Sequence, residues 1–235
     1  MANPVTNRLP AGKSPSLLTG FDRVAWCYDA LAALTFGPAL RNTQRAALAG
    51  LPAGAPHVLV LGGGTGWVLA EILRRRPAAT VLYLEASPRM LARARARLGP
   101  GQQRQVVFRH GTQNNLEPAD TFDAIVTFFV LDCLPEAVVP AALARLDAAR
   151  RPGAPWLLAD FRPAGQGWRR GLLTVMYAFF RFTTGLTTRT MTDFTALLLA
   201  RGLRLQSRQL FFAQAVEAVV MADEAAASGK TVSAS

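Results

Sequence analysis

A glycine-rich turn followed by one carboxylate is the part of this sequence best suited to binding a small molecule. The apolar run 57–61 predicts a buried strand, and Gly62-Gly63-Gly64-Thr65-Gly66 follows it directly before a helical segment. Glycines between a strand and a helix let a ligand approach the backbone and the helix N-terminus closely. Glu85 comes nineteen residues after Gly66, at the end of the next predicted strand. Because a carboxylate there can accept hydrogen bonds from both hydroxyls of a ribose, we expect a ribose-containing cofactor.

The spacing of the glycines separates two kinds of ribose-containing cofactor. The dinucleotide fingerprint is G-x-G-x-x-G, and counted from Gly62 its sixth position is the bulky Trp67. The spacing present is G-x-G-x-G, with glycine at 62, 64 and 66. A nicotinamide-dependent oxidoreductase is therefore disfavoured. A structural alternative for Glu85 is a capping acid beside Ser87 at the start of the next helix.

Four motifs in this order resemble those of class I S-adenosylmethionine-dependent methyltransferases. They are the glycine turn, Leu-Glu-Ala-Ser-Pro-Arg-Met-Leu at 84–91, Phe-Asp-Ala-Ile-Val at 122–126 and Arg-Pro-Gly-Ala at 151–154. Residues 21–29 with Phe36-Gly37 resemble the ubiquinone/menaquinone-biosynthesis group of that family. The resemblance implies S-adenosyl-L-methionine as cofactor. It also implies cofactor-binding roles for Gly62, Gly63, Gly64, Thr65, Gly66, Glu85, Ala86, Thr112, Gln113 and Phe128.

Two positions depart from the family pattern. Where the family usually has an acid two residues before the first glycine, this chain has Val60. Where the family often has an acid that meets the adenine amine, this chain has Thr112 and Gln113. A hydroxyl or amide at these positions could still bond the adenine edge. Each lost charge-assisted hydrogen bond costs about 1.5–3 kcal/mol. A noncatalytic cofactor-binding or scaffolding relative is therefore the alternative to an enzyme.

The chemistry is expected beyond the carboxyl ends of the first and fourth strands, where the order of a doubly wound sheet reverses. Methyl transfer from a sulfonium is an in-line displacement that needs alignment and a water-poor pocket. A base is required only for an acceptor such as a phenol, hydroxyl or acidic carbon. Asp132 is the candidate base by position, with a solvent-facing helix cap as its alternative role. The family resemblance adds Tyr28, because it places the N-terminal helix over the cofactor.

Strands alternating with helices predict an α/β fold, because strands that are apolar on both faces need helices on both sides. Strands are expected at 57–61, 80–85, 105–108, 122–129 and 156–161. The runs 203–212 and 214–221 are close enough to pair as a hairpin. We therefore expect a Rossmann-like, doubly wound, mostly parallel seven-stranded sheet with a C-terminal antiparallel hairpin.

The organisation of the chain is expected to be one methyltransferase domain over residues 20–222, between a flexible arm at 1–19 and a flexible tail at 223–235. Helices are predicted within 20–50. The aromatic segment within 162–190 is interpreted as a lid that builds the acceptor site. A surface helix touching a membrane and a helix packed on the sheet edge are its alternatives.

Composition and charge exclude some classes of protein. With 51% hydrophobic and 17% charged residues, the 235-residue chain is not disordered. The net charge of +11 comes from scattered arginines, since all but two of the 26 basic residues are arginine. A nucleic-acid methyltransferase is disfavoured, because Phe128-Phe129-Val130-Leu131 replaces the Asn/Asp-Pro-Pro-aromatic motif that follows the fourth strand in such enzymes. The expected partner is a small apolar or aromatic acceptor, and a lipophilic molecule is one option within this class.

The expected location is the cytoplasm. No apolar run approaches the length of a membrane span, no secretion signal precedes the domain, and two cysteines make no disulfide framework. Peripheral contact with a membrane stays open. No metal is expected, because His57 and His110 are too far apart in sequence to show metal-ligand spacing.

Overall fold

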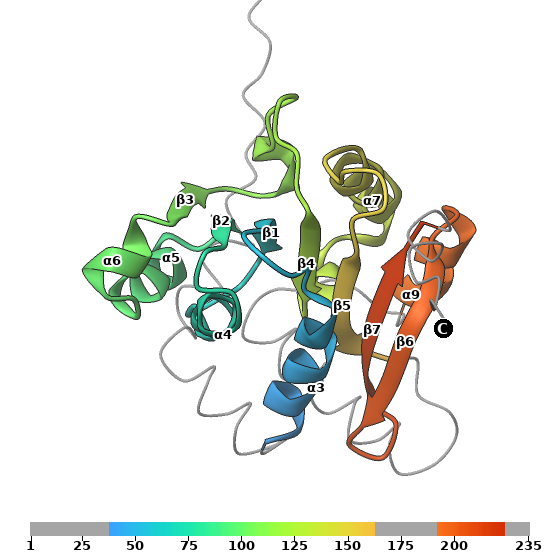
Figure 1. The fold of residues 1–235 in the computed structure, drawn as a ribbon. Coiled ribbons are helices and arrows are strands. Elements are labelled where there is room, and N and C mark those ends of the chain that lie inside the picture. Colours follow the sequence, from blue (N-terminus) through green and yellow to red (C-terminus); the bar gives the residue numbers. More distant parts are fainter. Residues whose placement is uncertain (1–37, 163–191, 224–235) are drawn as a thin grey trace, which may run out of the picture.

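A seven-stranded sheet is the centre of the fold in the computed structural model, which describes residues 38–162 and 192–223 (Figure 1). The strand order is β3-β2-β1-β4-β5-β7-β6. Strands β1 to β5 pair in parallel, and β7 is antiparallel to both β5 and β6. The predicted fold class is therefore confirmed. The strands are β1 His57–Leu61, β2 Thr80–Glu85, β3 Val106–His110, β4 Ala124–Phe128, β5 Trp156–Phe161, β6 Arg204–Phe211 and β7 Val216–Ala222.

Helices cover both faces of this sheet, as Figure 1 shows for α4 and α7. Alternate strand residues face opposite sides, so Val58 and Val60 pack with α3, α4 and α5, whereas Leu59 and Leu61 pack with α7 and α9. Each face thus has its own apolar core. The helices are α3 Ala39–Ala47, α4 Trp67–Arg75, α5 Pro88–Ala96, α6 Pro100–Gln103, α7 Val139–Ala148 and α9 Phe194–Ala200.

The helix that follows β2 begins at a side-chain cap and buries an apolar face. The Ser87 side chain accepts a hydrogen bond from the Met90 backbone N–H, and Pro88 occupies the first turn of α5. Met90, Ala94 and Leu98 are buried. These residues pack α5 against the sheet beside the glycine turn.

Strand boundaries differ from the expectation for the third and fourth strands. β3 covers Val106–His110 where 105–108 was expected, and β4 covers Ala124–Phe128 where 122–129 was expected. The fourth strand begins at Ala124, since the Asp123 carboxylate instead accepts the His57 backbone N–H at 2.8 Å and pairs with Arg151. A 3-10 turn, Glu136–Val138, precedes α7.

The strand order reverses between β1 and β4, so the segments after these strands meet at one edge of the sheet. The predicted arm at 1–19, most of the helical region at 20–50, the segment 163–190 and the tail from 224 lie outside the described residues. Within residues 38–162 and 192–223, no helix has the length and apolar character needed to cross a bilayer. The site is therefore described from the sheet, its helices and the loops at the switch point.

Candidate cofactor site at the switch point of the sheet

The turn after β1 uses backbone conformations that favour glycine. Gly62, Gly64 and Gly66 have φ values of +63°, +61° and +84°, in the region where a side chain is strained. The Gly62 N–H donates to the Leu84 carbonyl of β2 at 2.8 Å, which ties the turn to the neighbouring strand. Gly66 then directly precedes α4. The backbone of the turn is thereby held against the end of β2.

Packing around the turn also requires residues without a Cβ. A Cβ on Gly66 would lie 2.7 Å from the Cα and Cβ of Ala94 in α5, and one on Gly62 would clash with the Val130 side chain. The hydroxyl of Tyr83 donates to the Gly64 carbonyl at 2.8 Å. This hydrogen bond was not foreseen from the sequence, although the tyrosine stands two residues before Glu85. The turn therefore packs closely against Ala94, Val130 and Tyr83.

Glu85 points toward the glycine turn. One carboxylate oxygen accepts the Gly64 N–H at 2.9 Å, and the other accepts the Ser87 N–H at 2.9 Å. The side chain is buried, with 6% of the residue exposed. Burial raises the pKa of Glu85, whereas the hydrogen bonds from Ser87, Gly64 and Ala86 oppose that shift. Each oxygen has a second lone-pair site, so the carboxylate can also accept bonds from ligand hydroxyls.

The loop after β3 brings Thr112 and Gln113 to the same edge. Gly111 donates its N–H to the Glu85 carbonyl at 3.0 Å, which fixes the start of the loop beside β2. The Thr112 hydroxyl accepts the Asn114 N–H and is engaged locally. Gln113 is only 3% exposed, and its Oε1 is buried without a hydrogen-bond partner. A buried amide oxygen without a donor is suited to a ligand N–H, such as the amino group of adenine.

The segment after β4 contains the other predicted residues. Phe128 is buried in the core on the α3, α4 and α5 face of the sheet. Phe129 has a φ of +53°, its N–H donates to the Ala159 carbonyl at 2.8 Å, and its ring lies 5.3 Å from that of Phe161. Positive φ at a bulky residue is a strained conformation that often occurs at functional sites. Asp132 follows in a 3-10 turn and is half-buried.

Cys133 lies beside Asp132 and is not set up as a nucleophile. Its thiol approaches the Asp132 carboxylate at 3.5 Å. Burial and the neighbouring acids Asp132, Asp160 and Glu85 raise the pKa of the Cys133 thiol well above its ordinary value. A thiol is reactive as a thiolate, so this environment does not favour Cys133 as a nucleophile.

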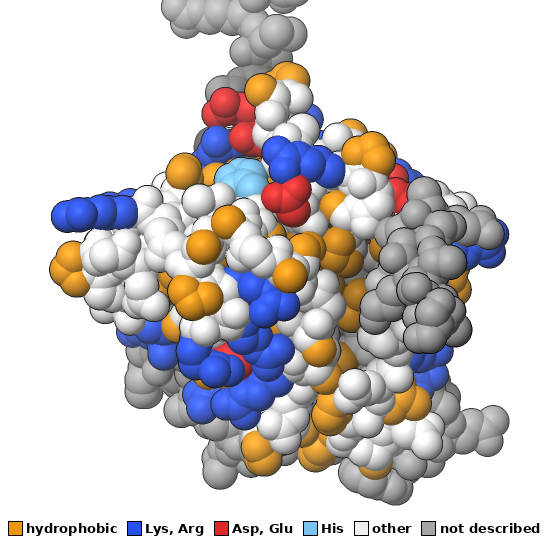
Figure 2. Space-filling view, in the orientation of Figure 1, with side chains coloured by type: hydrophobic (Ala, Val, Ile, Leu, Met, Phe, Trp, Pro, Cys, Tyr) orange, Lys and Arg blue, Asp and Glu red, His pale blue; other side chains and the backbone are white. Residues whose placement is uncertain are grey.

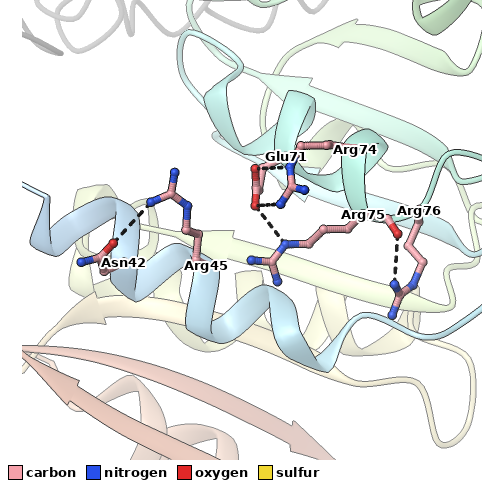
Figure 3. Close-up of polar contacts among 6 residues, drawn as sticks. All are labelled: Asn42, Arg45, Glu71, Arg74, Arg75 and Arg76. Atoms are coloured by element: carbon pink, nitrogen blue, oxygen red, sulfur yellow. Dashed lines mark hydrogen bonds and ion pairs between the residues drawn. The ribbon is translucent and has the colours of Figure 1, made fainter.

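Trp67 packs toward α3. Its ring lies 5.8 Å from the guanidinium carbon of Arg41 and 5.4 Å from that of Arg45, and both arginines belong to α3. Blue side chains gather around one red group over this part of the surface in Figure 2. Figure 3 shows the polar contacts there, in which Glu71 accepts hydrogen bonds from Arg74 and Arg75. The tryptophan therefore stabilises the contact between α4 and α3, in place of a dinucleotide pyrophosphate contact.

The histidines have structural contacts. His57 Nδ1 lies 2.8 Å from the Thr80 hydroxyl, and His110 Nε2 lies 2.9 Å from the Ala86 carbonyl. Within the described part of the chain, no three His, Cys, Asp or Glu side chains are grouped to hold a metal ion. The predicted residue Tyr28 lies outside the described residues.

The fold and the site together define a class of protein. A doubly wound sheet with a G-x-G-x-G turn after β1 and a carboxylate on that turn from the end of β2 is the arrangement of class I methyltransferases. The positive-φ glycines, the buried Glu85 carboxylate and the unpartnered Gln113 oxygen fit a nucleoside with ribose hydroxyls and an amino group. The residues present therefore fit the adenosyl part of S-adenosylmethionine.

Comparison with known proteins agrees with this class. Residues 58–153 match the family model described as a methyltransferase domain. A curated trans-aconitate 2-methyltransferase from Deinococcus radiodurans is 38% identical over 97 residues, which are 41% of this chain and 34% of that protein. The chain thus spans about a third of the length of that relative. Residues 58–153 are thus similar to a methyltransferase domain, and the fold of the described residues agrees with that match.

Solved structures share the fold at low sequence identity. The structure of a mitomycin 7-O-methyltransferase has a TM-score of 0.65 at 23% identity, covering 89% of this chain and 61% of that one. A Burkholderia thailandensis 1,6-didemethyltoxoflavin-N1-methyltransferase, with its substrate and S-adenosylhomocysteine bound, has a TM-score of 0.62 at 21% identity. That match covers 93% of this chain and 92% of the other. At these identities the likenesses show the fold alone.

Proposed function

We propose that this protein transfers a methyl group from S-adenosylmethionine to a small apolar or aromatic acceptor. The observation that carries the proposal is the Glu85 carboxylate on the glycine turn, 2.9 Å from the Gly64 N–H. When bound, the cofactor supplies an electrophilic methyl group on a sulfonium. The protein has to bind the adenosyl group, exclude water and align the acceptor.

The cofactor contacts are assigned to three segments that meet at the switch point. Glu85 accepts the ribose hydroxyls, and the turn from Gly62 to Gly66 lets the cofactor lie close to the backbone. Gln113 Oε1, which is buried without a partner, accepts the adenine amino group. Thr65, Ala86, Thr112 and Phe128 complete the predicted set. The amide of Gln113 thereby takes over a contact for which the family usually has an acid.

The acceptor class follows from the chemistry required and from the similar proteins. The two solved enzymes compared above carry names that denote methylation of small ring compounds, mitomycin and 1,6-didemethyltoxoflavin. Asp132, half-buried after β4, is the proposed base for an acceptor that must lose a proton. Tyr28 is retained as a second candidate. The resemblance to the ubiquinone/menaquinone-biosynthesis group favours a quinone-like ring as the acceptor.

Isothermal titration calorimetry with S-adenosylhomocysteine tests the cofactor site. Glu85→Gln keeps the size of the side chain and removes its charge, so we expect affinity to fall by about one to two decades, the equivalent of about 1.5–3 kcal/mol for hydrogen bonds to a charged group. Glu117→Gln is the matched control, because the Glu117 side chain is 68% exposed and pairs with Arg109 at 3.3 Å. Equal affinities in the two variants would contradict the assignment of Glu85.

A second measurement separates an enzyme from a noncatalytic relative. Purified protein is incubated with methyl-labelled S-adenosylmethionine and a panel of phenols, hydroquinones and heteroaromatic amines. Transfer of label that Asp132→Asn abolishes supports the proposal together with the base. Cofactor binding without transfer to any member of the panel favours the scaffolding alternative instead.

A further inference from the structure

Asp160, near the carboxyl end of β5, is a buried carboxyl group with one oxygen that makes no hydrogen bond. The residue is 1% exposed. Its Oδ1 accepts the backbone N–H of Phe161 at 2.8 Å, and its Oδ2 is buried without a partner. A buried polar atom without a partner costs free energy. An oxygen kept in this state is therefore a candidate for contact with a ligand.

The neighbouring acid shows how a structural carboxylate is stabilised in this protein. Glu217 of β7 is the direct cross-strand neighbour of Asp160. It accepts a hydrogen bond from the Thr195 hydroxyl at 2.7 Å and pairs with Arg208 at 2.6 Å and Arg162 at 3.4 Å. These arginines neutralise Glu217. Within residues 38–162 and 192–223, no corresponding ion pair forms with Asp160.

The environment of Asp160 favours its neutral form. Burial raises the pKa of Asp160 well above its ordinary value, and the charges of Asp132 and Glu217 act in the same direction. Because Oδ1 accepts an N–H, the proton of the neutral acid belongs on Oδ2. Asp160 therefore presents a buried O–H donor that has no acceptor. A carboxylic acid kept neutral by its surroundings is a known way to donate a hydrogen bond at neutral pH.

The position of Asp160 places this donor next to the proposed site. β5 pairs with β4 and packs against the turn Leu131–Cys133 that follows β4. Asp132 and Cys133 in that turn, and Phe129 before it, are only half-buried. Among the residues that the structure describes, Asp132, Glu217 and the Cys133 thiol are the titratable groups that interact with Asp160 or lie beside it. The donor thus lies at the carboxyl end of β5, on the side of β4 away from Glu85 and the glycine turn.

We propose that the Oδ2–H of Asp160 donates a hydrogen bond to a carbonyl or hydroxyl oxygen of the methyl acceptor. This inference rests on the proposed function and adds a substrate class, an uncharged oxygen-bearing ring compound. An ammonium group has no lone pair for the donor, and a neutral acid does not offset its charge. The site therefore selects uncharged oxygen compounds over amine cations.

Three small probes of similar shape test the proposal: phenol, toluene and benzylamine. Their dissociation constants are measured by ligand-observed NMR, with and without saturating S-adenosylhomocysteine. Asp160→Asn keeps a donor at the same place, whereas Asp160→Leu removes it. We expect phenol to bind Asp160→Leu roughly three- to tenfold more weakly than wild type, and Asp160→Asn within about threefold, the range for one neutral hydrogen bond. Toluene should show no such difference. Asp147, which lies in α7 and pairs with Arg150 at 2.9 Å, provides the control, and Asp147→Asn should leave phenol binding unchanged.

The wild-type protein provides a readout that does not depend on how the variants fold. In protein labelled with carbon-13 at aspartate carboxyls, the Asp160 resonance should keep the shift of a protonated acid at pH values where exposed aspartates are ionised. Addition of phenol should move that resonance. A resonance that titrates with an ordinary aspartate pKa, or that phenol does not move, would overturn the proposal.

The outcomes separate this inference from the proposed function. Loss of phenol binding in both Asp160 variants would mean that a negative charge on Asp160 is needed, and would overturn the donor role. Tighter binding of benzylamine than of phenol would overturn it as well. Failure of S-adenosylhomocysteine to bind would contradict the proposed function alone, since the phenol comparison is also made without it. Binding of the cofactor product with no effect of Asp160→Leu on phenol would contradict the inference alone.

Discussion

Gly66→Ala combines two costs at the turn that precedes α4. Gly66 has a φ of +84°, and a Cβ there would lie 2.7 Å from the Cα and Cβ of Ala94. The left-handed backbone costs about 1–2 kcal/mol for a residue with a side chain. Forcing α5 away from the turn costs about 1–3 kcal/mol more, as for other overpacked positions. We therefore expect the free energy of unfolding to fall by about 2–5 kcal/mol.

Gly54→Ala isolates the steric part of that cost. Gly54 has a similar φ of +79°, but a Cβ there would meet nothing within 4 Å. Any effect of alanine on the unfolded chain is shared by the two variants, so their difference of about 1–3 kcal/mol reports the contact with Ala94. Urea unfolding measures that difference. Calorimetry with S-adenosylhomocysteine should show weaker binding for Gly66→Ala alone, because only that substitution displaces the turn.

Equal stabilities of the Gly54 and Gly66 variants would contradict the steric argument. Equal cofactor affinities together with unequal stabilities would mean that the turn relaxes without moving the atoms that bind the ligand. In that case the closeness of α5 to the turn would serve stability only.

Two further substitutions test the surroundings of the turn and of α4. Gly62→Ala should lower the free energy of unfolding, because the new Cβ clashes with the Val130 side chain. Adding Val130→Ala should recover about 1–2 kcal/mol of that loss in urea unfolding. The strain of the φ of +63° remains in both variants. Glu71→Gln should cost about 1 kcal/mol at pH 7, because the carboxylate pairs with Arg74 and the half-buried Arg75. Hydrogen bonding from Arg74 is the largest cause that lowers the pKa of Glu71 to about 2 from 4.5, so the stabilisation is complete above pH 4.5 and is lost as the pH falls through about 2. Thermal unfolding from pH 7 to 2 should show the gap between wild type and Glu71→Gln closing, and a gap independent of pH would exclude the charge as its cause.

Local pattern was sufficient to predict the elements that hold the candidate cofactor site. The apolar run before Gly62 and the start of α5 at Ser87 and Pro88 need only neighbouring residues to be recognised. Their parallel pairing follows from the alternation of strands and helices. The approach of Glu85 to the glycine turn was predicted for the same reason, because adjacent parallel strands end at the same edge of a sheet.

Boundaries that depend on distant partners were predicted less well. The fourth strand starts later than expected because Asp123 bonds to the beginning of β1, 66 residues earlier in the chain. Trp67 was judged only as an obstacle in a binding motif, whereas its ring packs against arginines of α3. Neither contact leaves a periodic signal in the sequence.

The sequence by itself determined the α/β class, the strand-turn-helix around Gly62–Gly66 and the carboxylate after the second strand, because each is written in residues close together in the chain. Only the tertiary structure decided the state of the polar groups at the site. Asp160 and Glu217 are both acids near strand ends, yet the arginines reach one and not the other. Charge, burial and hydrogen-bond partners depend on which segments meet in space. The buried Asp160 with its unpartnered oxygen therefore could be recognised only in the tertiary structure.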